Sequence, residues 1–129
     1  MKIDYKISPE IDNTSLNKLF SESWVDYTTR SFEYLHNSLF YVCCYDENEL
    51  VGFINIASDG YLHAFILDVT VSPGYRRKGI GTELIQKAIT DCKIKGIEWV
   101  HVDYVEHLET FYYKCGFKDT KAGLINLKN

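Results

Sequence analysis

Residues 68–85 read DVTVSPGYRRKGIGTELI, an apolar run that breaks at Pro73-Gly74 and is followed by a helical pattern. Between the break and the helix stand three consecutive cations and two glycines one residue apart, namely Arg76, Arg77, Lys78, Gly79 and Gly81. The first amides of a helix have no intrahelical partner, and the helix dipole places partial positive charge there. Glycine lets a backbone approach a ligand closely, and an arginine fork suits phosphate oxygens. The stretch therefore predicts a strand, a turn and a helix whose residues 76–82 bind a phosphate or diphosphate.

The segments around this loop alternate between strand and helix patterns. Strands are predicted at 3–7, 39–45, 50–57, 61–71 and 99–104, and helices from Asn13 or Thr14 to about residue 22 and at 30–38, 79–95 and 107–115. The tail, residues 116–129, reads as two short strands about a turn.

The strand at 61–71 is apolar on both faces, with Ala64 and Ile66 on one and, on the other, Phe65, Leu67, Val69 and Val71. A strand that is buried on both faces implies helices above and below the sheet. The expected fold class is α/β of the α+β type, with a mixed, mostly antiparallel central sheet and helices on both faces. The strand–helix–strand unit across 61–104 is expected to be a right-handed parallel crossover at the phosphate site.

Length, charge and cysteine usage narrow the class of protein. A chain of 129 residues is expected to form one domain, residues 1–129, and a net charge of −4 counts against nucleic acid or an anionic membrane as partner. The N-terminus has no apolar signal core, so we expect a cytoplasmic protein with reduced thiols at Cys43, Cys44, Cys92 and Cys115. No metal site is expected, because the sequence holds no CxxC pair and no histidine cluster at zinc spacing.

Three nucleotide-binding loops resemble the glycine-rich stretch to different degrees. A P-loop would need a lysine within Gly81-Thr82-Glu83, and a dinucleotide fingerprint would need a third glycine where Leu84 stands. The string Val71-Ser72-Pro73 followed by Arg76 through Gly81 resembles the Q/R-x-x-G-x-G/A motif of the GCN5-related N-acetyltransferases, the GNAT superfamily. FYYKCGF at 111–117 is similar to a second segment of that family, F-Y-x-K-x-G-F. The chain thus resembles a small, single-domain, bacterial-type member, although Val105 stands where many relatives carry asparagine.

The resemblance implies transfer of the acetyl group of acetyl-CoA to a primary amine by direct attack, with CoA as product. It implies that Tyr112, rather than the neighbouring Tyr113, protonates the departing thiolate, and that the Val69 N–H polarises the thioester carbonyl. The pantetheine arm of relatives lies along the strand before the loop. The resemblance therefore assigns cofactor binding to Leu67, Val69, Val71, Arg76, Arg77, Lys78, Gly79, Ile80, Gly81 and Thr82.

Residues on the acceptor side are candidates from their chemistry. Asp68 interrupts an apolar strand and is a candidate base, since a buried acid is costly unless it is partnered or functional. A structural carboxylate bonded to nearby backbone is the alternative, as is a water chain without a dedicated base. The acceptor pocket is expected near the loop between the first two helices and the splayed strand ends, with Trp24, Tyr27, His63, Asp103 and His107 as its candidates. Trp24 could equally be a packing anchor.

Other functions remain open at this level. A non-catalytic acyl-CoA-binding or sensing module would keep the phosphate loop, and an acetylating toxin would act on charged tRNA. The presence of Tyr112 counts against the first, and the net charge of −4 counts against the second. The acceptor is a small-molecule or protein amine, and a homodimer is an open alternative to a monomer.

Overall fold

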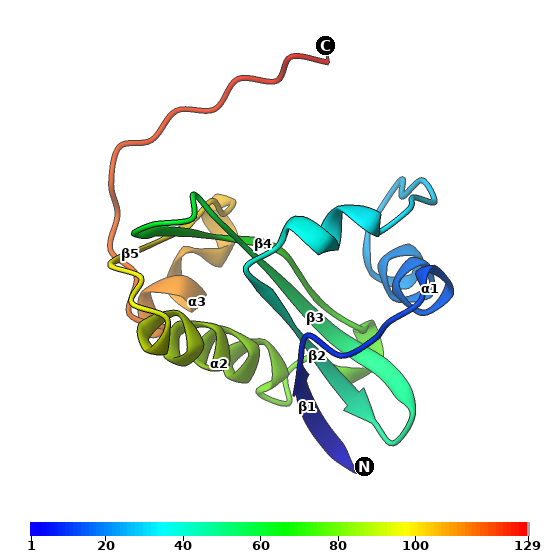
Figure 1. Ribbon diagram of the computed structural model, residues 1–129. Helices are drawn as coiled ribbons and strands as arrows, with labels where there is room; N and C mark the ends of the chain where they lie inside the picture. The colour runs from blue at the N-terminus through cyan, green and yellow to red at the C-terminus, as the bar shows by residue number, and fades with distance from the viewer. Residues whose placement is uncertain (129) are drawn as a thin grey trace.

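A mixed five-stranded sheet forms the centre of the computed structural model, which describes residues 1–128. The strands are β1 (Ile3–Ile7), β2 (Phe40–Asp46), β3 (Glu49–Ser58), β4 (His63–Val71) and β5 (Trp99–Val102). They lie in the order β1-β2-β3-β4-β5, and every neighbouring pair is antiparallel except β4 and β5 (Figure 1). The predicted mixed, mostly antiparallel sheet and the parallel unit at 61–104 are therefore confirmed.

Helices cover both faces of the sheet, as predicted. The α-helices are α1 (Asn13–Ser23), α2 (Ile80–Ile94) and α3 (Glu109–Lys114), and the 3-10 helices are η1 (Glu33–Asn37), η2 (Pro73–Tyr75) and η3 (Glu106–Leu108). Figure 1 shows α2 and α3 on one side of the sheet and α1 with η1 on the other. Among residues 1–128, no helix combines the length and the apolar character that a bilayer span requires.

The N-cap of α1 lies one residue before the predicted candidates. The predicted caps of α1, Asn13 and Thr14, are wrong, because the cap is Asp12. Its carboxylate accepts a hydrogen bond from the Ser15 amide at 2.7 Å, which satisfies one donor of the first turn. The apolar positions of α1 that the pattern placed on one face, Leu16, Leu19 and Phe20, are all buried.

Two apolar cores lie on the two sides of the sheet. Between α2 and the sheet are Val42, Cys44, Ile54, Ile56, Ile80, Leu84, Ile85 and Ala88, among others. Beneath α1 and η1 are Leu16, Leu19, Phe20, Phe32, Leu35, Cys43, Leu50 and Phe53. Alternate residues of β2 and β3 enter opposite cores, because successive side chains of a strand point to opposite faces.

A bulge in β4 overturns the expected assignment of its two faces. Phe53 pairs with Thr70 and Asn55 with Leu67, so Ile54 alone stands opposite the two residues 68 and 69. The extra residue shifts the alternation by one position. As a result, Ala64 and Ile66 share the α2 face with Val69 and Val71, whereas Phe65 and Leu67 lie on the other face, 38% and 45% exposed. The strand is therefore not buried on both sides.

The tail also differs from the expected structure. Residues 118–128 form no strand, and they extend away from the body (Figure 1), so the predicted pair of short strands is absent from the described residues. Residue 129, the end of that predicted segment, lies outside the described residues. The chain is last held at Asp119, whose carboxylate accepts hydrogen bonds from the hydroxyls of Tyr104, at 2.8 Å, and Tyr113. Strand-forming sequence thus stands here without a partner strand.

Candidate active site

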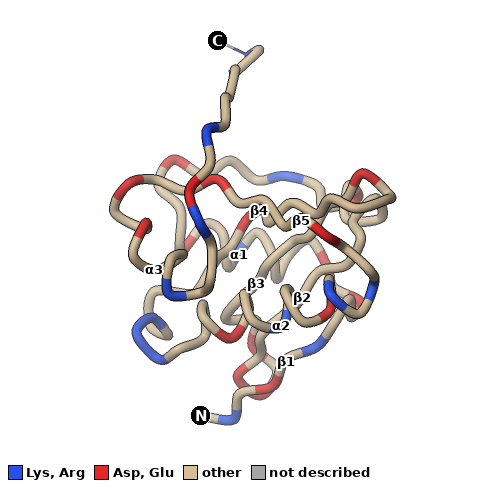
Figure 2. Tube along the Cα trace, turned by 90° about the vertical axis from the view of Figure 1, so that its left-hand side faces the viewer, with Lys and Arg blue, Asp and Glu red and all other residues tan. Residues whose placement is uncertain are grey.

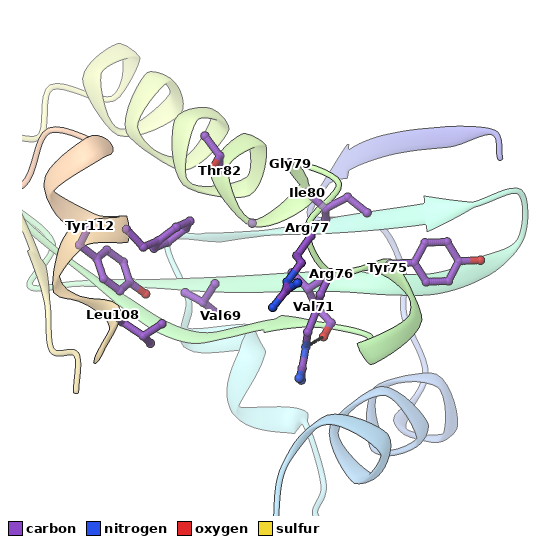
Figure 3. A pocket seen from close by; sticks show the side chains of 12 residues that line it. Val69, Val71, Tyr75, Arg76, Arg77, Gly79, Ile80, Thr82, Leu108 and Tyr112 are labelled. Atoms are coloured by element: carbon purple, nitrogen blue, oxygen red, sulfur yellow. Dashed lines mark hydrogen bonds between the residues drawn. The ribbon is translucent and has the colours of Figure 1, made fainter. Parts of the chain in front are cut away.

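The site lies where the parallel strands separate. Pairing between β4 and β5 ends at Ile66 and Val102, and the two strands diverge beyond these residues. A cavity of about 460 Å³ opens between the last part of β4, the start of α2 and α3 (Figure 3). Its lining consists of Val69, Val71, Tyr75, Arg76, Arg77, Gly79, Ile80, Gly81, Thr82, Leu108, Phe111 and Tyr112.

The N-terminus of α2 presents free backbone donors to this cavity. Gly79 is the N-cap, with φ of +82°, and no side chain caps the helix. The first intrahelical bond runs from the Glu83 amide to the Gly79 carbonyl, so the amides of residues 80–82 keep no helical acceptor. Arg77 is also left-handed, with φ of +63°, and the two left-handed positions turn the chain sharply into the helix. The predicted phosphate loop therefore has the geometry of an anion site.

The three cations of the loop play different parts. The Arg76 guanidinium donates hydrogen bonds to the carbonyls of Val71, at 3.2 Å, and Ser23, at 3.4 Å, and so ties the loop to β4 and α1. Arg76 and Arg77 both line the cavity, whereas Lys78 does not, and the guanidinium of Arg76 is already bonded to the two carbonyls. Arg77 is consequently the cation best placed to meet an anion there.

Tyr112 reaches the cavity from α3, and Tyr113 does not. The Tyr112 ring is 5% exposed and stacks on Tyr104 with centroids 4.8 Å apart. Figure 3 shows Tyr112 extending toward Val69 on β4. Burial raises the pKa of the Tyr112 phenol, which keeps it protonated at neutral pH. Tyr113 is 41% exposed and donates its hydroxyl hydrogen bond to Asp119.

Asp68 faces the opposite side of the sheet, within a group of polar side chains that the sequence did not reveal. Its backbone is left-handed, with φ of +56°, at the bulge. Its carboxylate accepts a hydrogen bond from the Tyr34 hydroxyl at 3.2 Å, and Arg30 donates to that hydroxyl at 3.4 Å. Burial raises the pKa of the Asp68 carboxyl, and the positive charge of Arg30 partly opposes this shift. A side chain on η1, rather than nearby backbone, is therefore what holds this acid.

Arg30 is itself enclosed by aromatic rings. Its guanidinium lies between 5.2 and 5.8 Å from the ring centroids of Phe20, Trp24, Tyr27 and Phe32. Such contacts attract a cation to the ring faces and restrict the side chain. Nothing in the local sequence indicated that Arg30 and Tyr34 would lie beside Asp68, because Asp68 belongs to a strand that is distant in the sequence.

The residues predicted to contact the acceptor do not line the cavity. Trp24 donates its indole N–H to the Thr70 hydroxyl at 3.1 Å, and the Tyr27 hydroxyl donates a hydrogen bond to the Asn17 side chain. Both residues pack against the core on the α1 face of the sheet. His63 is the first residue of β4, at the end of the strand away from the cavity, and its Nδ1 atom lies 2.7 Å from Nε2 of His101. Asp103 and His107 are exposed on the chain that follows β5.

The predicted cofactor residue Leu67 does not line the cavity. Leu67 was expected on the cofactor strand face but lies on the other face, because the bulge intervenes. Leu108, Tyr75 and Phe111 line the cavity although the sequence did not select them as site residues. Tyr75 lies within the glycine-rich string and Phe111 begins the FYYKCGF segment, whereas Leu108 had no signal. Val105 is the N-cap of η3, 57% exposed, and makes no side-chain capping bond.

Known proteins resemble this chain in sequence and in fold. A model of the acetyltransferase (GNAT) family matches residues 10–117. Histone acetyltransferase TAP1 of Glycine max is 30% identical over 79 residues, 61% of this chain and 34% of that protein. Streptothricin acetyltransferase A of Bacillus subtilis (strain 168) is 47% identical over 49 residues, 38% of this chain and 28% of that protein. The chain thus spans about a third of the length of these curated relatives.

A solved structure matches the whole described fold. The GNAT family acetyltransferase SP0256 of Streptococcus pneumoniae TIGR4 has a TM-score of 0.76 and 24% sequence identity, and the match covers 98% of this chain and 99% of that chain. At this level of identity the likeness concerns the arrangement of the sheet and helices.

Proposed function

This chain belongs to the acetyltransferase (GNAT) family, and from that membership we propose that it transfers the acetyl group of acetyl-CoA to a primary amine by direct attack. The observation that carries the proposal is that one continuous cavity joins the uncapped start of α2 to Val69 and Tyr112. The reaction forms a nitrogen–carbon bond and breaks the carbon–sulfur bond of the thioester. One proton leaves the amine, and another is delivered to the thiolate.

The residues at the cavity mouth suit a CoA diphosphate. Arg77 and the amides of residues 80–82 supply positive charge and directed donors, without a competing side-chain cap. A Cβ at Gly81 would be in ordinary van der Waals contact with the Phe111 ring, at 3.6 Å, and glycine keeps this part of the cavity wall free of side-chain atoms. Further in, the backbone of Val69 and Val71 is proposed to hold the pantetheine arm. When bound, acetyl-CoA supplies the acetyl group as an activated thioester.

The bulge is proposed to supply an oxyanion donor. A β-bulge leaves one residue outside the ladder of interstrand hydrogen bonds. Of the two bulge residues, Val69 lines the cavity. An N–H of this kind, aimed at the thioester oxygen, is worth about 3–4 kcal/mol in other acyl-transfer enzymes.

Tyr112 is proposed as the general acid. Its phenol enters the cavity from α3 and is protonated at neutral pH, because burial raises its pKa. It can therefore donate a proton to the sulfur as the thiolate departs.

Asp68 is proposed as the base on the acceptor side. It is adjacent to Val69, but its carboxylate lies on the α1 face of the sheet, where Tyr34 holds it. The amine would then approach from the α1 face while the thioester lies on the α3 face. The raised pKa of the Asp68 carboxyl brings it closer to the pKa of the amine group whose proton it would accept. Tyr34 acts as a positioning residue through its hydrogen bond.

The test is a panel of small amines and peptides with acetyl-CoA, in which release of free CoA thiol and acetylated product are both followed. Stoichiometric product and thiol with at least one amine support transfer. Saturable binding of acetyl-CoA with no product and no thiol across the panel would instead favour a non-catalytic acyl-CoA-binding module. Absence of binding would overturn both.

A further inference from the structure

Two of the four histidines meet on neighbouring strands of the sheet, away from the cavity. His63 is the first residue of β4, and His101 lies in β5, which runs parallel beside β4 (Figure 2). The pairing places His101 opposite Phe65, two residues after His63, so both imidazoles lie on the same face of the sheet. The sequence predicted no metal site from the spacing of its histidines, but strand pairing joins two that are 38 positions apart.

The contact between the two rings is close. Nδ1 of His63 and Nε2 of His101 are 2.7 Å apart, and two nitrogens that both present lone pairs repel each other at this distance. One proton between them satisfies the contact as a hydrogen bond, and a metal ion that accepts both lone pairs also satisfies it. With nitrogen–metal bonds of about 2.0–2.1 Å at 90–109° to each other, the nitrogens stand about 2.9–3.4 Å apart. The rings therefore need to separate by less than about 1 Å to admit an ion.

Both imidazoles are held in place by the structure around them. The His101 ring stacks on Phe65, with ring centroids 4.7 Å apart and planes 20° apart. The His63 amide donates a hydrogen bond to Oδ1 of Asp59 at 3.1 Å, which fixes the start of β4 against the preceding turn. Ligands that stand on paired strands and are supported in this way lose little freedom when they bind an ion.

Charge and access also suit a cation. Backbone hydrogen bonds from Tyr61 and His63 hold the pKa of the Asp59 carboxyl below its ordinary value, so a negative charge stands beside the pair at neutral pH. His101 is exposed and His63 is partly exposed. Within residues 1–128 no set of three or more histidine, cysteine or acidic side chains is placed to hold an ion, so water would complete the coordination of the pair.

The other side chains that bind such ions are less suited to it. All four cysteines are free thiols and are at most 8% exposed, and burial raises the pKa of each one. They therefore stay protonated and sheltered from solvent. The two remaining histidines, His36 and His107, lie on separate elements, η1 and η3.

From these observations we propose that His63 and His101 form a surface site for one divalent ion of the Ni²⁺, Cu²⁺ and Zn²⁺ class, bound through Nδ1 and Nε2. Imidazole nitrogen suits these ions, whereas Mg²⁺ and Ca²⁺ prefer oxygen ligands. The proposal does not depend on the acetyl-transfer reaction.

The experiment is calorimetric titration of the full, untagged chain with NiCl₂ or ZnCl₂, with MgCl₂ as the negative control. The expected result is one ion bound per chain and no binding of Mg²⁺. His63→Gln and His101→Gln should each raise the dissociation constant at least about tenfold, because each removes one of the two ligands. His36→Gln and His107→Gln are the matched controls and should leave it within about twofold, since each removes an exposed histidine elsewhere. Circular dichroism checks that all four variants are folded.

Trp99 offers a second readout that locates the ion. It is the register partner of His63 and is 57% exposed, so Cu²⁺ bound at the pair should quench its fluorescence. Trp99→Phe should remove the quenching while the calorimetric dissociation constant for Ni²⁺ stays within about twofold, because the indole is not a ligand. Absence of saturable Ni²⁺ and Zn²⁺ binding up to ~1 mM overturns the proposal and leaves the pair as a hydrogen bond. Binding that survives in His63→Gln or in His101→Gln overturns it as well.

Discussion

The Asp68 carboxylate accepts a hydrogen bond from the Tyr34 hydroxyl at 3.2 Å, although 34 positions of sequence separate the two residues. The contact joins the bulge of β4 to η1 and holds the acid on the α1 face of the sheet. The proposed proton removal by Asp68 and the proposed proton delivery by Tyr112 would therefore take place on opposite faces of the sheet. The first prediction tests this arrangement.

Replacing Asp68 by asparagine should raise stability at neutral pH and lower turnover. A carboxyl whose pKa is raised by burial contributes its full stability below the ordinary aspartate pKa of about 3.9, and this contribution is lost as pH rises through the folded value. Asparagine keeps an acceptor for Tyr34 but does not ionise. Asp68→Asn should therefore have a higher Tm than the parent at pH 7 and an equal Tm near pH 4, with turnover reduced about 100-fold. A lower Tm at pH 7 would contradict the sign of the shift.

Tyr112→Phe should reduce turnover by about 10²–10³-fold with little change in acetyl-CoA affinity, because only the acidic proton is removed. The alkaline limb of the rate profile should lie above the usual tyrosine pKa of about 10 in the parent and should disappear in the variant. Tyr113→Phe is the control, since its hydroxyl bonds Asp119 outside the cavity. Steady-state kinetics with an identified amine decide between them. Loss of turnover in Tyr113→Phe alone would show that the register of the acid is wrong by one residue.

Gly79 and Gly60 form a matched pair for testing the phosphate loop. Their φ values are +82° and +81°, and nothing lies within 4 Å of a Cβ built on either. Alanine at either position should therefore cost a similar ~1–2 kcal/mol of backbone strain. Only Gly79→Ala, at the N-cap of α2, should also lose acetyl-CoA affinity, as measured by calorimetry. Equal affinities in the two variants would place the diphosphate elsewhere.

Acetyl-CoA and CoA should stabilise the protein against heat, and NAD and ATP should do so far less. At about 100 times its dissociation constant a ligand adds about 2.7 kcal/mol, which is several degrees in Tm for a domain of this size. A thermal-shift series with the four ligands measures it. Equal shifts with ATP would indicate a site selective for phosphate alone.

The loop cations should differ in effect although their charges are alike. Arg77→Ala should weaken acetyl-CoA binding about tenfold at low salt and less at 1 M salt, since Arg77 lines the cavity. Lys78→Ala removes the same charge beyond the cavity lining and should change affinity less. Arg76→Ala should instead lower the free energy of unfolding by about 1 kcal/mol, because the bonds to Val71 and Ser23 are lost. Binding titrations at two salt concentrations and denaturant unfolding separate the three; equal affinity losses in Arg77→Ala and Lys78→Ala would count against the distinction.

The sequence by itself determined the turn and helix start at residues 76–82 and the order of elements through α3. A helix start, a left-handed glycine and an uncapped first turn depend on a few consecutive residues, so the segment 76–82 could be identified from its pattern alone. The same holds for the apolar face of α1, because helical periodicity is local. The choice of Tyr112 over Tyr113 came from the family resemblance, and of the two tyrosines Tyr112 is the one that lines the cavity.

Tertiary structure alone decided which face each residue of β4 occupies. A period of two predicts the faces only while the ladder is regular, and the bulge opposite Ile54 depends on how β3 pairs with β4. Leu67 consequently lies on the face away from the cavity, and the Asp68 carboxylate accepts a hydrogen bond from Tyr34 of η1 on the α1 face of the sheet. The tail shows the same limit, because a strand exists only where another strand offers its backbone groups, and within residues 1–128 none does so for residues 120–128.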